Sequence, residues 1–154
     1  MSPTEEDVLA KVLTAILALG ILGCGGKLHV EHITDPVYPY PARYEGAQGT
    51  VVVNIAIASD GHVIYAKGSG APEVLVKAAE ENAKQWIFGP FPPACEFPIY
   101  HSIRYVYKLE GKPKAVAIQP VIRTFLPDRI EISAVPLVSD YPPLTDYKPI
   151  PKTK

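Results

Sequence analysis

The stretch "GTVVVNIAIASDGHVIYAK", residues 49–67, decides the fold. Every second residue from Val51 to Ile57 is valine or isoleucine, which is the period-two pattern of a β-strand with one apolar face. Asp60 and Gly61 follow after Ala58 and Ser59. This pair favours a hairpin because glycine takes the positive φ that tight turns need. We therefore predict that residues 62–67 return as a second strand.

A helix is predicted next, in "APEVLVKAAEENAKQW", residues 71–86. Pro72 suits the first turn of a helix, and Glu73 is favourable at the positive end of the helix dipole. A stripe at helical spacing should face the sheet, and it consists of Leu75, Ala79, Asn82, Ala83 and Trp86.

A third strand is predicted in "IYHSIRYVYKL", residues 99–109, where side chains alternate again. One face carries Ile99, His101, Ile103, Tyr105, Tyr107 and Leu109, and the opposite face carries Tyr100, Arg104, Val106 and Lys108. The order strand, strand, helix, strand predicts an α+β domain: a small three-stranded antiparallel sheet packed against one main helix.

Residues 112–135 hold two short apolar alternations around Leu126, Pro127 and Asp128. This pattern predicts an additional C-terminal hairpin, which could pair with the edge of the sheet. The proline-rich end, residues 136–154, is predicted to be a disordered or extended tail.

Composition limits both domain number and partner class. At 154 residues the chain has room for one domain and tails, and its 17 prolines, about twice the average usage, belong in loops and tails. The formal net charge of −1 shows no basic surplus of the kind that binds phosphate, which argues against nucleic acid as a partner.

Residues 1–24 contain an uncharged apolar run from Val12 to Leu22. A membrane-spanning helix needs roughly 20 apolar residues, so this run better matches the core of a signal peptide. It ends in "ILGC", which resembles a bacterial lipobox and predicts lipidation of Cys24. The alternative is an uncleaved short anchoring helix. Both interpretations tether the chain at its N-terminus, with residues 25–36 as a linker.

Two cysteines are too few for a disulfide framework, and their spacing does not suit a zinc site. A bridge between Cys24 and Cys95 stays open, because sequence does not give the geometry. His29 and His32, three residues apart with Glu31 between them, provide only a weak metal-site pattern, because no further ligand stands nearby. We predict no catalytic residue, no metal and no cofactor, and hence no enzyme.

Three stretches together resemble one known family. "YPYPARYEGAQGTVVVNIAIASDGHV", "AAEENAKQWIFGP" and "SIRYVYKLEG" are similar to the C-terminal domain of TonB, the bacterial energy transducer of the outer membrane. The matching marks, in order over residues 35–111, are Tyr38 and Pro39, Ala42 and Arg43, Gly49, Val51–Ile57, Asp60 and Gly61, Ala78–Trp86, and Ile99–Leu109. The domain itself is assigned to residues 37–111. In the family a short first helix follows the Tyr-Pro pair; here Pro41 and Gly46 should shorten it to one turn or abolish it.

The resemblance implies protein binding without catalysis. Such domains hold a short extended segment, the TonB box, of an outer-membrane transporter by adding it to a strand edge. The resemblance places that edge at Ile99–Leu109, and the predicted partner-binding residues are Ile99, Tyr100, Ser102, Arg104, Val106 and Lys108. Inner-membrane motor proteins are further partners that the family implies, and the location would be the periplasmic side of the cell envelope, in either membrane.

A second function stays open. Only about a dozen residues separate Cys24 from Tyr38, where a force transducer usually has a long spacer. The chain could therefore be a tethered periplasmic structural module or lipoprotein that uses the same fold for self-association, for example as a homodimer, or for scaffold contacts.

Overall fold

The structure, a computed structural model, describes residues 27–138. Two helices and seven strands follow one another in these residues. They are β1 (Val30–His32), α2 (Tyr40–Glu45), β2 (Gly49–Ile57), β3 (Val63–Ser69), α3 (Glu73–Ala83), β4 (Ile87–Phe88), β5 (Ile99–Leu109), β6 (Val121–Phe125) and β7 (Arg129–Ala134). The fold class is α+β.

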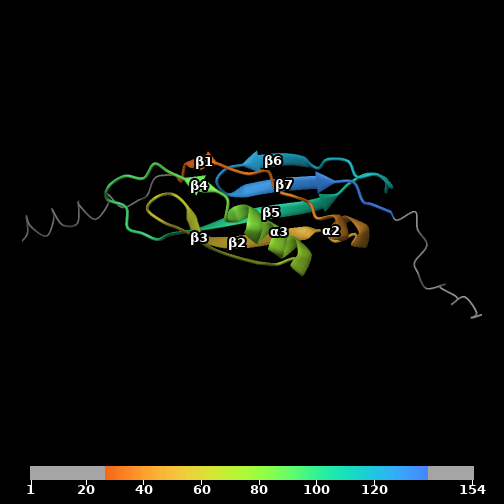
Figure 1. Ribbon diagram of the computed structural model, residues 1–154, viewed down its shortest axis with the longest axis horizontal. Helices are drawn as coiled ribbons and strands as arrows, with labels where there is room; N and C mark the ends of the chain where they lie inside the picture. The colour runs from red at the N-terminus through yellow and green to blue at the C-terminus, as the bar shows by residue number, and fades with distance from the viewer. Residues whose placement is uncertain (1–26, 139–154) are drawn as a thin grey trace, which may run out of the picture.

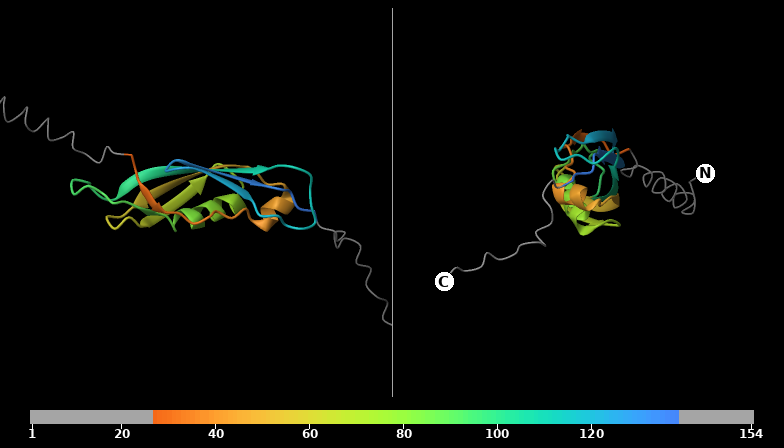
Figure 2. Two further views of the ribbon diagram at one scale, coloured as in Figure 1. Left: turned by 90° about the horizontal axis from the view of Figure 1, so that it is seen from above. Right: turned by 90° about the vertical axis from the view of Figure 1, so that its right-hand side faces the viewer.

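Five strands form the main sheet, in the order β3-β2-β5-β7-β6 (Figure 1). Neighbouring pairs are antiparallel except β5 and β7, which run parallel. Both helices lie on one side of this sheet, and no helix of residues 27–138 covers its other face, which is called the open face below (Figure 2). A second, two-stranded sheet pairs β1 with β4.

The predicted three-stranded sheet was too small. β2, β3 and β5 are the three strands expected, but β6 and β7 extend the sheet beyond β5. The physical reason lies in β7, whose Ile130 and Ile132 are fully buried. A sheet that ended at β5 would leave this apolar face without a partner surface, since three strands and one helix barely close a core.

The β2–β3 hairpin turns where Asp60 and Gly61 predict it. Gly61 has a φ of 87°, and a Cβ atom there would lie 2.0 Å from the carbonyl oxygen of Phe88. That oxygen belongs to β4, and the Phe88 N–H in turn donates to the Gly61 carbonyl at 2.9 Å. Only glycine fits, because both the backbone angle and the close approach exclude a side chain.

The first helix is present but short. Pro41 lies in the first turn of α2, and Gly46 ends the helix in the left-handed conformation, with its N–H bonded to the Ala42 carbonyl. Arg43 is 2% exposed, and its Nε donates to the Val135 carbonyl at 3.0 Å. The Leu137 N–H donates to the Arg43 carbonyl at 3.1 Å, so α2 is tied to the chain that follows β7.

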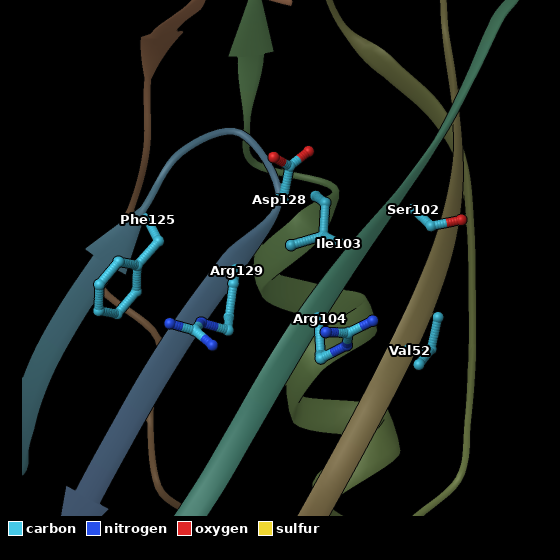
Figure 3. Close-up of a pocket in the computed structure, with 7 residues that line it drawn as sticks. All are labelled: Val52, Ser102, Ile103, Arg104, Phe125, Asp128 and Arg129. Carbon is cyan, nitrogen blue, oxygen red and sulfur yellow. The ribbon is translucent and has the colours of Figure 1, made fainter.

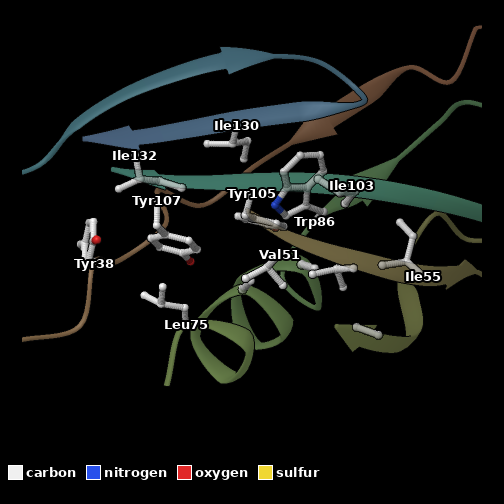
Figure 4. Packing of buried hydrophobic residues seen from close by; sticks show 14 of the residues in the cluster. Tyr38, Val51, Ile55, Leu75, Trp86, Ile103, Tyr105, Tyr107, Ile130 and Ile132 are labelled. Carbon is white, nitrogen blue, oxygen red and sulfur yellow. The ribbon is translucent and has the colours of Figure 1, made fainter. Parts of the chain in front are cut away.

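The core lies between the sheet and α3 (Figure 4). All five residues of the predicted helical stripe are buried, as are the alternate residues of β2. Trp86 is fully buried, with its ring 5.8 Å from that of Phe88 and 6.4 Å from that of Tyr105. Asn82 lies beside them, and its Oδ1 accepts hydrogen bonds from Trp86 Nε1 at 3.0 Å and from the Tyr105 hydroxyl at 2.9 Å.

Buried tyrosines make the fold sensitive to alkaline pH. Burial raises the pKa of Tyr38 from 10.0 to about 12, although Arg43 partly opposes the shift. Burial also raises the pKa values of Tyr105 and Tyr107 above the usual range. Because the unfolded chain ionises these groups at lower pH than the folded chain does, their contribution is fully present below pH 10. It is lost progressively above pH 10, up to about pH 12 for Tyr38 and beyond that for Tyr105 and Tyr107.

We therefore expect the free energy of unfolding to fall between about pH 10 and 12. Urea titrations at several pH values would measure it, with tyrosinate absorbance as a second signal. Tyr107→Phe should reduce the slope, while Tyr65→Phe, at a half-exposed position, should leave it unchanged. A free energy of unfolding that stays constant across this window would contradict the burial argument.

Candidate functional site

β5 lies in the interior of the sheet, between β2 and β7. The Arg104 N–H donates to the Asp128 carbonyl at 2.8 Å, and the Glu110 N–H donates to the Ala134 carbonyl at 2.9 Å. The register pairs Val106 with Glu131 and Lys108 with Ser133. Backbone groups alternate in direction along a strand, so the N–H groups of Arg104, Val106 and Lys108 all point toward β7.

This arrangement corrects the expectation that Ile99–Leu109 forms a free edge. From Arg104 to Leu109 that edge is covered by β7, a strand of the same chain, in parallel register. The expected edge came from the family arrangement, in which the third strand of the domain is the last. Here the chain continues and places β7 where an added strand would lie.

The first half of β5 extends beyond β7. The register with β7 begins at Arg104, so Ile99, Tyr100 and Ser102 have no partner in β7. Tyr100 is 77% exposed, and the Ser102 hydroxyl donates to Asn54 Oδ1 at 2.6 Å. These three predicted residues thus lie in a short stretch of β5 that, within residues 27–138, pairs with β2 alone.

The outer side of β6 is the edge that remains at this end of the sheet. Within residues 27–138 no strand pairs with it. The even-numbered residues of β7 direct their backbone carbonyls toward β5. The backbone groups of the odd-numbered residues therefore point toward β6, as at Glu131, which pairs with Arg123. By the same alternation the backbone N–H and C=O of Ile122 and Thr124 point outward, where an extended segment could pair with them.

The opposite edge of the sheet is partly blocked by a side chain of α3. The Gly68 N–H of β3 donates to Glu80 Oε1 at 2.7 Å, and Lys67 Nζ lies 3.5 Å from the same oxygen. The Gly68 hydrogen bond and the Lys67 charge hold the pKa of the Glu80 carboxyl below its usual range. A carboxylate bound at this point protects β3 against edge pairing.

The open face of the sheet is rich in cations. β5, β6 and β7 direct four cations and one carboxylate away from the helices, and these are Arg104, Lys108, Arg123, Arg129 and Glu131. Glu131 lies 3.9 Å from Lys108 Nζ and 3.7 Å from Arg129 Nε, so one carboxylate is shared by two of the cations.

A shallow pocket of about 340 Å³ lies on this face (Figure 3). Its floor is a row of paired residues across four strands, Val52, Arg104, Arg129 and Phe125. The Arg129 guanidinium lies 4.3 Å from the centre of the Phe125 ring. Asp128, in the turn between β6 and β7, forms part of the rim.

The sequence predicted binding residues on one strand, β5, whereas the cations of the open face come from three strands, β5, β6 and β7. It named Arg104 and Lys108, which do lie on the open face, but it missed Arg123, Phe125 and Arg129. The alternation in residues 121–134 was visible; the position of β7 next to β5 was not. Cys24 lies outside the described residues, so its lipidation stays a prediction.

In residues 27–138 no three His, Cys, Asp or Glu side chains cluster as metal ligands would. No helix in that range has both the length and the apolar character needed to cross a membrane. His29 and Glu31 lie at the start of the small β1–β4 sheet, where the His29 carbonyl accepts a hydrogen bond from the Gly89 N–H at 3.0 Å.

Comparison with known families matches the part of the fold that ends with β5. The family described as Gram-negative bacterial TonB protein C-terminal matches residues 34–109, from the segment before α2 to the end of β5. A comparison with curated proteins found no match. The family consists of non-enzymatic protein-interaction domains that generally contact outer-membrane transporters. This chain therefore belongs, through residues 34–109, to the TonB C-terminal domain family.

Proposed function

We propose that this chain is a non-catalytic module of the cell envelope that binds an extended segment of a protein partner by strand addition at β6. The observation that carries the proposal is the outward edge of β6, where the backbone groups of Ile122 and Thr124 have no strand beside them within residues 27–138. An extended peptide that pairs there gains backbone hydrogen bonds, which supply affinity with little dependence on sequence.

The partner segment we expect is the TonB box of an outer-membrane transporter, because the family contacts such transporters. Val106 cannot offer its backbone to a partner while β7 is in place. Arg104 and Lys108 would instead act through their side chains on the open face. Tethering at the N-terminus, on the periplasmic side, would hold the module close to its membrane, and motor proteins are partners expected from the family alone.

Thr124→Pro is the variant that tests this edge. The Thr124 N–H points away from β7, so proline removes the outward donor and leaves the β6–β7 hydrogen bonds in place. We expect affinity for a synthetic peptide of the TonB-box type to fall about tenfold or more, since the ring also obstructs the edge. Fluorescence polarisation of the labelled peptide would measure it.

Thr124→Ala is the matched control, because it keeps the N–H and should bind like the wild type. Circular dichroism must remain unchanged in both variants. Equal affinity of the peptide for wild type and Thr124→Pro would overturn strand addition at β6. Val106→Pro is unsuitable as a binding probe, because the Val106 N–H points toward β7 and proline would break the β5–β7 hydrogen bonds within the domain.

A structural module without transporter binding is the second candidate, and the coverage of β5 by β7 favours it. A domain that carries its own strand at this edge needs no partner to complete the sheet. In that case β6 would pair with β6 of a second copy, and two such sheets would join in antiparallel fashion. Light scattering after gel filtration would then give a dimer for wild type and a monomer for Thr124→Pro, with no binding of the peptide.

A further inference from the structure

Charge is distributed unevenly between the two sides of this domain. The open face of β5, β6 and β7 holds Arg104, Lys108, Arg123 and Arg129 against two carboxylates, Glu131 and, at the rim of the pocket, Asp128. On the other side of the sheet, α3 carries three glutamates and one lysine. A partner of opposite charge would therefore be attracted to the sheet face and repelled by the helix face.

We propose that this open face is a docking surface for an acidic segment of a protein partner, with Arg104 and Arg129 binding one of its carboxylates. The inference rests on the proposed function in taking the partner to be a protein, but it uses the face of the sheet and does not depend on the β6 edge. It specifies the chemistry of the partner segment: glutamate or aspartate, with apolar neighbours.

The two arginines are suitably placed for this role. They are register partners on adjacent parallel strands, which lie about 4.8 Å apart in a sheet. Two planar guanidinium groups at this spacing can hold one carboxylate through paired N–H···O bonds. The Arg129 guanidinium already contacts the Phe125 ring at 4.3 Å and lies 3.7 Å from the Glu131 carboxylate, so less side-chain freedom is lost on binding.

The surroundings of the pair favour a peptide over a polyanion. Val52 and Phe125 lie at the two ends of the arginine row and can contact apolar side chains next to the bound carboxylate. Asp128 and Glu131 lie beside the row and would repel a continuous anionic surface, such as a nucleic acid or an anionic membrane. Those ligands are bound by surfaces on which many phosphates are neutralised together.

The test uses the full chain and two labelled nonapeptides, one of alternating valine and glutamate and one of alternating valine and glutamine. Arg104→Gln combined with Arg129→Gln should lower affinity for the glutamate peptide about fivefold to tenfold, the effect of losing one or two partly exposed charge pairs. Lys77→Gln combined with Lys84→Gln removes the same charge from the helix side and should leave affinity unchanged. Added salt should weaken the binding of the glutamate peptide and leave the binding of the glutamine peptide unchanged.

Three results would overturn the proposal: equal binding of the two peptides, equal loss in both double variants, or no binding of the glutamate peptide at millimolar concentration. Vesicles of 30% anionic lipid provide a competing test, and binding to them in preference to the peptide would assign the face to a membrane. Thr124→Pro separates the two proposals, because it changes the β6 edge and leaves the open face intact. Docking on the face alone predicts that the glutamate peptide still binds Thr124→Pro and does not bind the Arg104→Gln, Arg129→Gln variant.

Discussion

Replacing Trp86 with alanine should lower the free energy of unfolding by about 3–5 kcal/mol, the usual cost of truncating a buried tryptophan. Trp86 is fully buried in the short connection between α3 and β4, with its ring against Phe88 and Tyr105. Truncation leaves a cavity between helix and sheet and removes the donor to Asn82 Oδ1. Since whole domains are stable by only about 5–15 kcal/mol, much of the population could unfold at ambient temperature.

Urea titration followed by circular dichroism is the measurement, because the chain has one tryptophan and the variant loses that fluorescence. Trp86→Phe is the graded control: it keeps part of the volume and should cost less than alanine. A melting temperature within about 2 °C of wild type for Trp86→Ala, where about 10–20 °C is expected, would show that the indole does not hold α3 on the sheet.

Replacing Asn82 with alanine should cost about 2–4 kcal/mol, because it leaves several buried polar groups without partners. Its Oδ1 accepts from Trp86 Nε1 and from the Tyr105 hydroxyl, and its Nδ2 donates to the Thr34 carbonyl at 2.7 Å. One amide thus joins α3, β5 and the segment before α2. In low-dielectric surroundings each orphaned donor loses a water partner without replacement.

Gln85→Ala is the matched control, since it removes an exposed amide that lies just after α3 and donates to the Glu81 carbonyl of that helix. We expect its cost to stay below about 0.5 kcal/mol. Tyr105→Phe completes a double-mutant cycle with Asn82→Ala, and the two costs should add to more than the cost of the double variant. Strict additivity would contradict the shared hydrogen bond.

The α+β class and the core could be predicted because their patterns are local. Alternation in β2 and β5 and the helical spacing from Leu75 to Trp86 each identify one face of one element. Asp60 and Gly61 then fix the connection between two strands. The buried residues of these elements follow directly.

The order of the added strands could not be predicted because it depends on distant contacts. A hairpin of residues 121–134 could meet β5 through either of its strands, and chain order alone favours β6. Burial decides instead: β7 places Ile130, Ile132 and Ala134 in the core, whereas β6 offers only Ile122 and Thr124 on that side. β1 and β4 were missed because segments of three and two residues show no period.

The candidate site could be predicted from the sequence only in part, for the same reason. Arg104 and Lys108 follow from alternation within β5, but the partners of Arg104 in the row, Arg129 and Phe125, lie on strands whose position was unknown. Because these strands extend the sheet, its open edge lies at β6 and not at β5. Side-chain direction can be read from one strand, whereas an edge is a property of the whole sheet.

Amide hydrogen exchange, followed by NMR with and without a TonB-box-type peptide, tests the central claim most directly. Without peptide, the amides of Val106 and Lys108 should exchange slowly because β7 covers them, and those of Ile122 and Thr124 should exchange fast. With saturating peptide, Ile122 and Thr124 should become slow while Val106 and Lys108 stay slow. Loss of protection at Val106 and Lys108 on peptide addition, or no change at Ile122 and Thr124, would contradict strand addition at β6.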